Sequence, residues 1–170
     1  MSQRPVLSVP RSSQIVILDL IAIAGLVALW AAAVYGWTQV PLRLPIHFGL
    51  DGHPDVWSNN RNWLWLLPCL GTVHLITFTI VRHFPHTFNY PVAITAENAA
   101  YQYTIAVKLI TWLQAEILLG LAYIQWQMVQ AALEQAIGLG VWFIPLFLLV
   151  ILGTSGYWLR AALTTSFHLQ

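Results

Sequence analysis

Charged residues are scarce in this chain. Its 170 residues include seven Lys or Arg and six Asp or Glu, which together make up 8% of the sequence. A soluble globular domain carries roughly 25% of such residues. With a third of that proportion the chain cannot cover a water-facing surface, and 58% of its residues are hydrophobic. The composition therefore indicates a protein embedded in lipid and excludes an ordinary soluble domain.

Cysteine and net charge are also low. The one cysteine, Cys69, excludes an intramolecular disulfide and a zinc site built from four cysteines. The formal net charge of +1 leaves no basic patch, so we do not expect nucleic acid as a partner. We also expect no cofactor. At this length the sequence predicts a single transmembrane domain over residues 1–170.

Four apolar runs are long enough to cross a bilayer core of ~30 Å at about 1.5 Å per residue. They occupy about residues 15–37, 63–81, 101–128 and 141–163. Each has to be helical, because a lone strand in lipid would leave its backbone groups unpaired. The sequence thus predicts an all-α integral membrane four-helix bundle, with a structured outer loop at residues 38–62 between its first two helices.

The direction of insertion follows from the cations beside the spans, since cytoplasmic loops carry an excess of Lys and Arg. If the N-terminus is cytoplasmic, five cations fall on the inner side: Arg4, Arg11, Arg82, Lys108 and Arg160. Arg43 and Arg61 then fall on the outer side. The sequence therefore predicts a multi-pass protein with both termini in the cytoplasm and the loop at residues 38–62 outside.

The outer loop is expected to be folded. Three prolines restrict its backbone, and two glycines allow tight turns. Apolar residues occupy alternate positions from Leu42 to Leu50, which is a weak strand pattern. We expect the loop to fold back on the mouth of the bundle and to bury Ile46, Phe48 and Trp57 against the helix ends.

The same loop carries a recognisable order of residues, namely Leu44-Pro45-Ile46-His47-Phe48, then Gly52, Asp55 and Trp57. This order resembles the P-x-H-F … G … D-x-[WY] signature of the DUF1648 family of small membrane proteins. That family occurs alone or beside the SdpI-type bacteriocin-immunity domain. The resemblance covers the first span, the loop and the start of the second span, including Pro68. Residues 88–92 and 95–98 are also similar to the inner segment of longer members.

One position departs from the family pattern. A lysine usually follows shortly after the aromatic residue, whereas this chain has Asn59 and Asn60 before Arg61. The resemblance implies a protein that sequesters or senses an extracytoplasmic ligand. The ligand-binding residues it implies here are Pro45, His47, Phe48, Gly52, Asp55 and Trp57.

His47, Asp51, His53 and Asp55 place two imidazoles and two carboxylates within nine residues. Such side chains are common ligands of divalent metals, but no recurrent metal-binding spacing is present, and we assign no metal site. Alternatively, Asp51 and Asp55 bond backbone N–H groups in turns while His47 is packed and hydrogen-bonded. A third reading is a surface that binds a peptide, a lipid headgroup or a partner subunit.

Four ionisable residues lie inside the predicted spans, where each costs roughly 2.5–3.5 kcal/mol on insertion scales and needs a partner. They are Asp19, His74, Lys108 and Glu116. Our favoured pair is Asp19 with Lys108, and Arg82 or Arg160 could replace the lysine. Glu116 and His74 lie at a similar depth and could bond to each other. These groups serve either as polar contacts between helices or as a path for protons or ions.

Small residues cluster in the fourth span, at Gly153-Thr154-Ser155-Gly156. They allow a neighbouring helix to approach closely, and that helix belongs either to this chain or to another subunit.

Three classes of function remain open. The first is a non-enzymatic membrane protein of the immunity or signalling type, which binds a ligand through the outer loop. The second is an accessory subunit of a larger membrane complex. A metal-dependent membrane enzyme ranks last, because the sequence shows neither a nucleophile elbow nor H-E-x-x-H, and we assign no catalytic residue. The expected partners are membrane lipid, other membrane subunits or an extracytoplasmic peptide.

Overall fold

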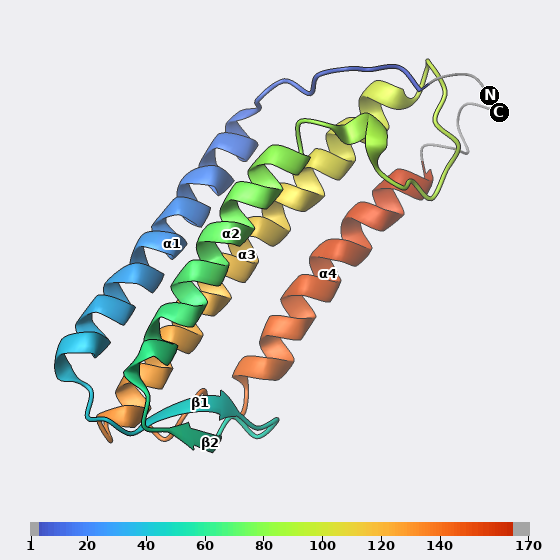
Figure 1. Ribbon diagram of the computed structural model, residues 1–170. Coiled ribbons are helices and arrows are strands. Elements are labelled where there is room, and N and C mark those ends of the chain that lie inside the picture. The colour runs from blue at the N-terminus through green and yellow to red at the C-terminus, as the bar shows by residue number, and fades with distance from the viewer. Residues whose placement is uncertain (1–3, 165–170) are drawn as a thin grey trace.

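The computed structural model describes residues 4–164 and contains four long helices (Figure 1). Helix α1 spans Ser13–Gln39, α2 spans Leu66–Val81 after a short 3-10 helix η1 at Arg61–Trp65, α3 spans Ala99–Ala132, and α4 spans Phe143–Thr164. All four are long and apolar enough to cross a membrane. The four predicted spans are therefore confirmed, with ends that differ by a few residues.

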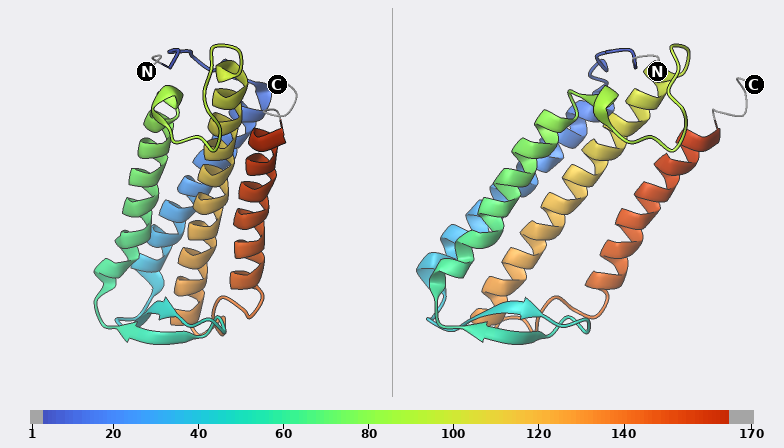
Figure 2. Two further views of the ribbon diagram at one scale, coloured as in Figure 1. Left: turned by 90° about the vertical axis from the view of Figure 1, so that its right-hand side faces the viewer. Right: turned by 45° about the vertical axis from the view of Figure 1, so that its right-hand side comes forward.

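Helix α3 is the centre of the bundle. It contacts each of the other three helices, whereas α4 packs chiefly on α3 and stands apart from α2 (Figure 2). Small residues let α1 and α3 approach closely, since a Cβ at Gly25 would lie 3.2 Å from the backbone carbonyl carbon of Leu118. The molecule is thus a three-helix core of α1, α2 and α3 with α4 leaning on one side.

The loop between α1 and α2 forms a two-stranded antiparallel hairpin, so the weak strand pattern is confirmed. Strand β1 spans Leu44–Phe48 and β2 spans Pro54–Ser58. Leu44 pairs with Ser58 at the open end, and Phe48 pairs with Pro54 near the turn, with irregular register between them. Strand β1 packs on α3, which leaves β2 as the outer strand.

The hairpin and the start of α1 lie at opposite ends of the bundle (Figure 1). We call the end at which α1 begins and α4 finishes the terminal end, and the other the hairpin end. Four spans in alternating directions place the described ends of the chain on one side and the hairpin on the other. The cytoplasmic location of the terminal end stays a prediction.

A small apolar core joins the hairpin to the helices. Its buried members are Val40, Leu44, Leu64, Met128, Val129 and Ala132. Ile46 and Phe48 pack against this core and are partly buried, as expected. Trp57 is different, because its side chain is 38% exposed. The expectation that Trp57 is buried was wrong, because Trp57 lies on β2, which faces away from the helix ends.

At the terminal end, a long connection between α2 and α3 includes the 3-10 helix η2 at Pro85–Thr87. The hydroxyl group of Tyr90 donates to the carbonyl of Pro85 at 2.8 Å. Burial raises the pKa of Tyr90 above its usual range, and the nearby Tyr103 adds to that effect while Arg4 opposes it. Arg4 also donates to the carbonyl of Phe88 at 2.6 Å, which fastens the segment before α1 to this connection.

Candidate functional site

The hairpin carries the signature residues, and its base is anchored in the protein. Leu44 and Pro45 at the start of β1 are fully buried. The Arg61 guanidinium donates to the carbonyl of Val40 at 2.6 Å and so joins the end of α1 to the start of η1. Both strands therefore leave the bundle from a fixed base. Arg61, the cation at the position where the chain departs from the family pattern, has a structural contact here.

The tip of the hairpin is anchored as well. The amide of Leu139, in the connection between α3 and α4, donates to the carbonyl of Gly52 at 2.8 Å. Gly52 has a φ of +79°, and a Cβ added there would lie 2.6 Å from the carbonyl oxygen of Gly140. Only glycine fits both the backbone conformation and the close approach. The hairpin is thus held at its base and tip and lies across the mouth of the bundle.

Between these anchors the polar side chains are displayed outward. The His47 ring Nδ1 lies 2.6 Å from Asp55 Oδ1, and the two side chains are 65% and 49% exposed. Asp51 accepts a hydrogen bond from the backbone amide of His53 at 3.0 Å, as expected for a turn. Asp55 bonds His47 instead of a backbone group, and His47 is exposed instead of packed. An exposed pair of this kind contributes only about 0–1 kcal/mol to stability.

Trp57 completes the displayed surface of the hairpin. The Arg43 guanidinium lies over its ring, 5.0 Å from the ring centroid. The structure therefore brings His47 together with Asp55 and Trp57 with Arg43, whereas Pro45, Phe48 and Gly52 serve the packing of the hairpin. Within residues 4–164, no group of three or more His, Cys, Asp or Glu side chains is arranged to hold a metal ion.

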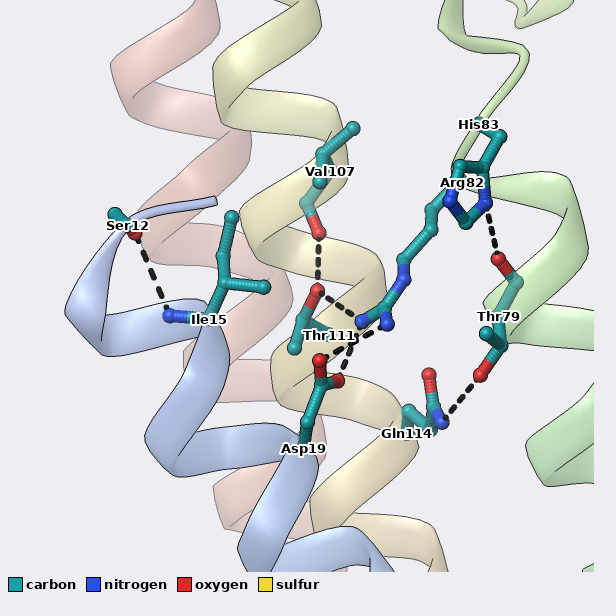
Figure 3. A network of polar contacts seen from close by, with 9 residues as sticks. All are labelled: Ser12, Ile15, Asp19, Thr79, Arg82, His83, Val107, Thr111 and Gln114. Carbon is teal, nitrogen blue, oxygen red and sulfur yellow. Dashed lines mark hydrogen bonds and ion pairs between the residues drawn. The ribbon is translucent and has the colours of Figure 1, made fainter. Parts of the chain in front are cut away.

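A second polar cluster lies inside the bundle near the terminal end (Figure 3). The Arg82 guanidinium binds the Asp19 carboxylate with two hydrogen bonds, of 2.5 and 3.0 Å. It also donates to the hydroxyl of Thr111 on α3 at 3.4 Å. The favoured pair of Asp19 with Lys108 was wrong, and the alternative partner Arg82 is the one observed. Lys108 instead lies over the Trp158 ring, 5.7 Å from its centroid.

Glu116 and His74 do not meet. The Glu116 carboxylate accepts a hydrogen bond of 2.6 Å from the hydroxyl of Thr154 on α4. His74 packs on the Phe78 ring with centroids 4.2 Å apart, and its Nε2 has no hydrogen-bond partner in the part of the chain that the structure describes. The suggested bond between Glu116 and His74 was therefore wrong, because their helices turn the two side chains toward different neighbours.

Some residues of these sites gave no usable signal in the sequence. Thr111 and Gln114 on α3 contribute to the interior cluster, but a threonine and a glutamine in a long apolar run are not distinctive. Gly138 and Gly140 lie in the loop that receives the hairpin tip, but glycines in a short connection indicate only a turn. Neither the positive φ of these glycines nor the contact between the two loops can be recognised from the sequence.

Comparisons with known proteins agree with the signature in the hairpin. Residues 24–72 match the domain of unknown function DUF1648. An uncharacterized protein of Archaeoglobus fulgidus is 34% identical over 82 residues, which cover 44% of this chain and 43% of that protein. The chain thus spans less than half of this curated relative. No solved structure shows a significant match. The chain is therefore a multi-pass membrane protein in which residues 24–72, from the middle of α1 through the hairpin to the first turns of α2, are similar to the DUF1648 domain.

Proposed function

We propose that this protein is a non-enzymatic binding protein of the immunity or signalling type, whose hairpin binds an extended peptide outside the cytoplasm. The observation that carries the proposal is the exposed pair of His47 and Asp55 on a hairpin that is rigidly held at both ends. Such a pair adds little to the stability of the fold. We therefore infer that the pair of His47 and Asp55 serves to bind a ligand.

The outer strand suggests how a peptide would dock. Strand β2 has no further strand beside it within residues 4–164, so its outer edge offers backbone donors and acceptors. An extended peptide can add to such an edge, with its side chains read by the neighbouring surface. Val56 and Trp57 provide an apolar surface along β2, at 46% and 38% exposure. His47 and Asp55 supply a hydrogen-bonding contact beside it.

A photo-crosslinking experiment in intact membranes of the host tests this proposal. With p-benzoylphenylalanine in place of Val56, we expect a discrete covalent adduct with a peptide or a protein segment. The same crosslinker in place of Val73, which is 61% exposed within the apolar span of α2, serves as the control and should give no such adduct.

Adding His47→Ala to the Val56 variant should remove the adduct while the abundance of the protein is unchanged, since the lost pair is worth only about 0–1 kcal/mol. An adduct that persists without His47, or no adduct at Val56 at all, would contradict the proposal. A parallel fall in abundance would show that the hairpin is scaffolding.

A second candidate function, an accessory subunit of a larger membrane complex, is favoured by the surface of α4. In the most apolar 18-residue stretch of α4 only 6% of the residues are buried, against 39% in that of α3. A Cβ at Gly153 or Gly156 would meet no atom of residues 4–164 within 4 Å. This small-residue surface could receive a helix of another subunit.

The substitution Gly153→Leu tests that candidate. It should release a co-purifying subunit in mild detergent, because the bulky side chain prevents close approach, but it should leave the fold intact. Val73→Leu on the exposed surface of α2 is the matched control and should retain the subunit. If native mass spectrometry finds the same assembly with Gly153→Leu as with the control, the surface of α4 is a lipid-facing one.

A further inference from the structure

A groove opens between α1 and α2 near the terminal end of the bundle. It encloses about 530 Å³. Its walls are apolar and are formed by Val16, Leu20, Ile23, Leu75, Ile76 and Ile80. From Ser13, the first residue of α1, to Ile23 is ten residues, or about 15 Å along a helix. That length is half of a bilayer core of ~30 Å, so the groove runs from the headgroup level to about the middle of the membrane.

The floor of the groove is polar, and one of its hydrogen-bonding groups has no partner among the described residues. The ion pair of Asp19 with Arg82 lies there, so these two charges compensate each other (Figure 3). The Gln114 amide nitrogen donates to the hydroxyl of Thr79 at 3.3 Å. Gln114 is only 1% exposed, yet its Oε1 has no hydrogen-bond partner among the described residues. The floor of the groove therefore contains a buried hydrogen-bond acceptor that no described residue satisfies.

The mouth of the groove is basic. Arg11 and Arg82 line both the groove and an adjoining niche of about 80 Å³, which also includes Ser8 and His83. Arg11 is exposed and makes no ion pair within residues 4–164. The uncompensated cation thus stands at headgroup level, at the end of an apolar groove that is open to lipid.

We propose that this groove binds one anionic phospholipid of the leaflet at the terminal end. The phosphate lies at Arg11 and the niche beside His83, and an acyl chain follows the apolar walls toward the middle of the membrane. A zwitterionic lipid would bring its own ammonium group to Arg11, and the repulsion between the two favours the anionic lipid. This inference does not depend on the proposed role of the hairpin.

Native mass spectrometry of the full chain tests the inference, with phosphatidylglycerol or phosphatidylcholine of identical acyl chains added to the detergent solution. The wild-type protein should retain one phosphatidylglycerol molecule with roughly fivefold preference, the effect expected of one arginine near an anionic headgroup. Arg11→Gln should reduce the preference to less than about twofold. Arg160→Gln is the matched control, because it removes another exposed cation of the terminal end that does not line the groove.

A steric variant examines the acyl chain separately. Ile76→Trp, on the exposed wall of α2, should fill the groove and lower the retention of both lipids. Equal retention of the two lipids by the wild-type protein would overturn the inference, as would an equal loss of preference in Arg11→Gln and Arg160→Gln. Displacement of the lipid by millimolar glycerol 3-phosphate would also overturn it, because it would show an anion site that needs no acyl chain.

Discussion

Replacing Arg82 by methionine is expected to lower the free energy of unfolding by about 3–5 kcal/mol, the cost of leaving one partner of a buried ion pair uncompensated. The Arg82 and Asp19 side chains are 7% and 20% exposed, and two hydrogen bonds join them. Methionine fills a similar length of side chain but offers no donor. The Asp19 carboxyl group would then have no partner inside the bundle.

The double variant Asp19→Asn with Arg82→Met isolates the charge effect. It should recover most of the lost stability, because neither residue then carries a charge that needs compensation. Equilibrium unfolding of the single and double variants in mixed micelles measures the difference in their free energies of unfolding. If the double variant is no more stable than Arg82→Met, then packing of the arginine and not its charge is what matters.

Lys108→Met is the matched control for the loss of an intramembrane cation. Lys108 contacts the ring of Trp158, an interaction worth roughly 0.5–1 kcal/mol. We therefore expect a loss of about 1 kcal/mol or less, and no rescue by Asp19→Asn. A rescue of Lys108→Met by Asp19→Asn would instead support the pair of Asp19 with Lys108 and contradict the pair of Asp19 with Arg82.

The difference between Lys108 and Arg82 shows what a sequence can and cannot predict in a membrane bundle. Hydropathy and length determine the spans, because every backbone group in lipid has to be satisfied within its own helix. Depth in the membrane also follows from residue number, and Asp19 lies in the second turn of α1, near the terminal end. The direction in which a side chain points depends on how each helix is rotated. Thr111 on α3 faces Arg82, whereas Lys108, three residues earlier, faces α4.

The hairpin likewise has features that the sequence predicts and features that it does not. Alternation in the loop predicted a strand, and Ile46 and Phe48 pack as that pattern requires. Alternation does not tell which strand lies outermost, and Trp57 is exposed because β2 is the outer strand. The contact of the hairpin tip with the connection between α3 and α4 joins residues far apart in sequence. Such a contact depends on the packing of the whole bundle and left no local pattern.

That distant contact leads to the second large expected effect. Replacing Gly52 by alanine should detach the tip of the hairpin from the connection between α3 and α4. A non-glycine residue at a φ of +79° costs on the order of 1–3 kcal/mol, and the added Cβ would also lie 2.6 Å from the carbonyl oxygen of Gly140. Backbone atoms cannot move aside as the end of a flexible side chain can. Both effects act on the hydrogen bond from Leu139 to Gly52.

Alanine substitutions at two other glycines distinguish backbone strain from a steric clash. Gly140 has a φ of +80°, but a Cβ there would meet no atom of residues 4–164 within 4 Å, so Gly140→Ala introduces strain alone. Gly153→Ala should introduce neither. Hydrogen exchange at the Leu139 amide should therefore accelerate most in Gly52→Ala, about tenfold for each 1.4 kcal/mol lost, less in Gly140→Ala and not at all in Gly153→Ala. Equal acceleration in the first two variants would mean that the tip is not seated against Gly140. The rigid display of His47 and Asp55 would then lose its support at that end, because their strands would be held only at the base formed by Leu44 and Arg61.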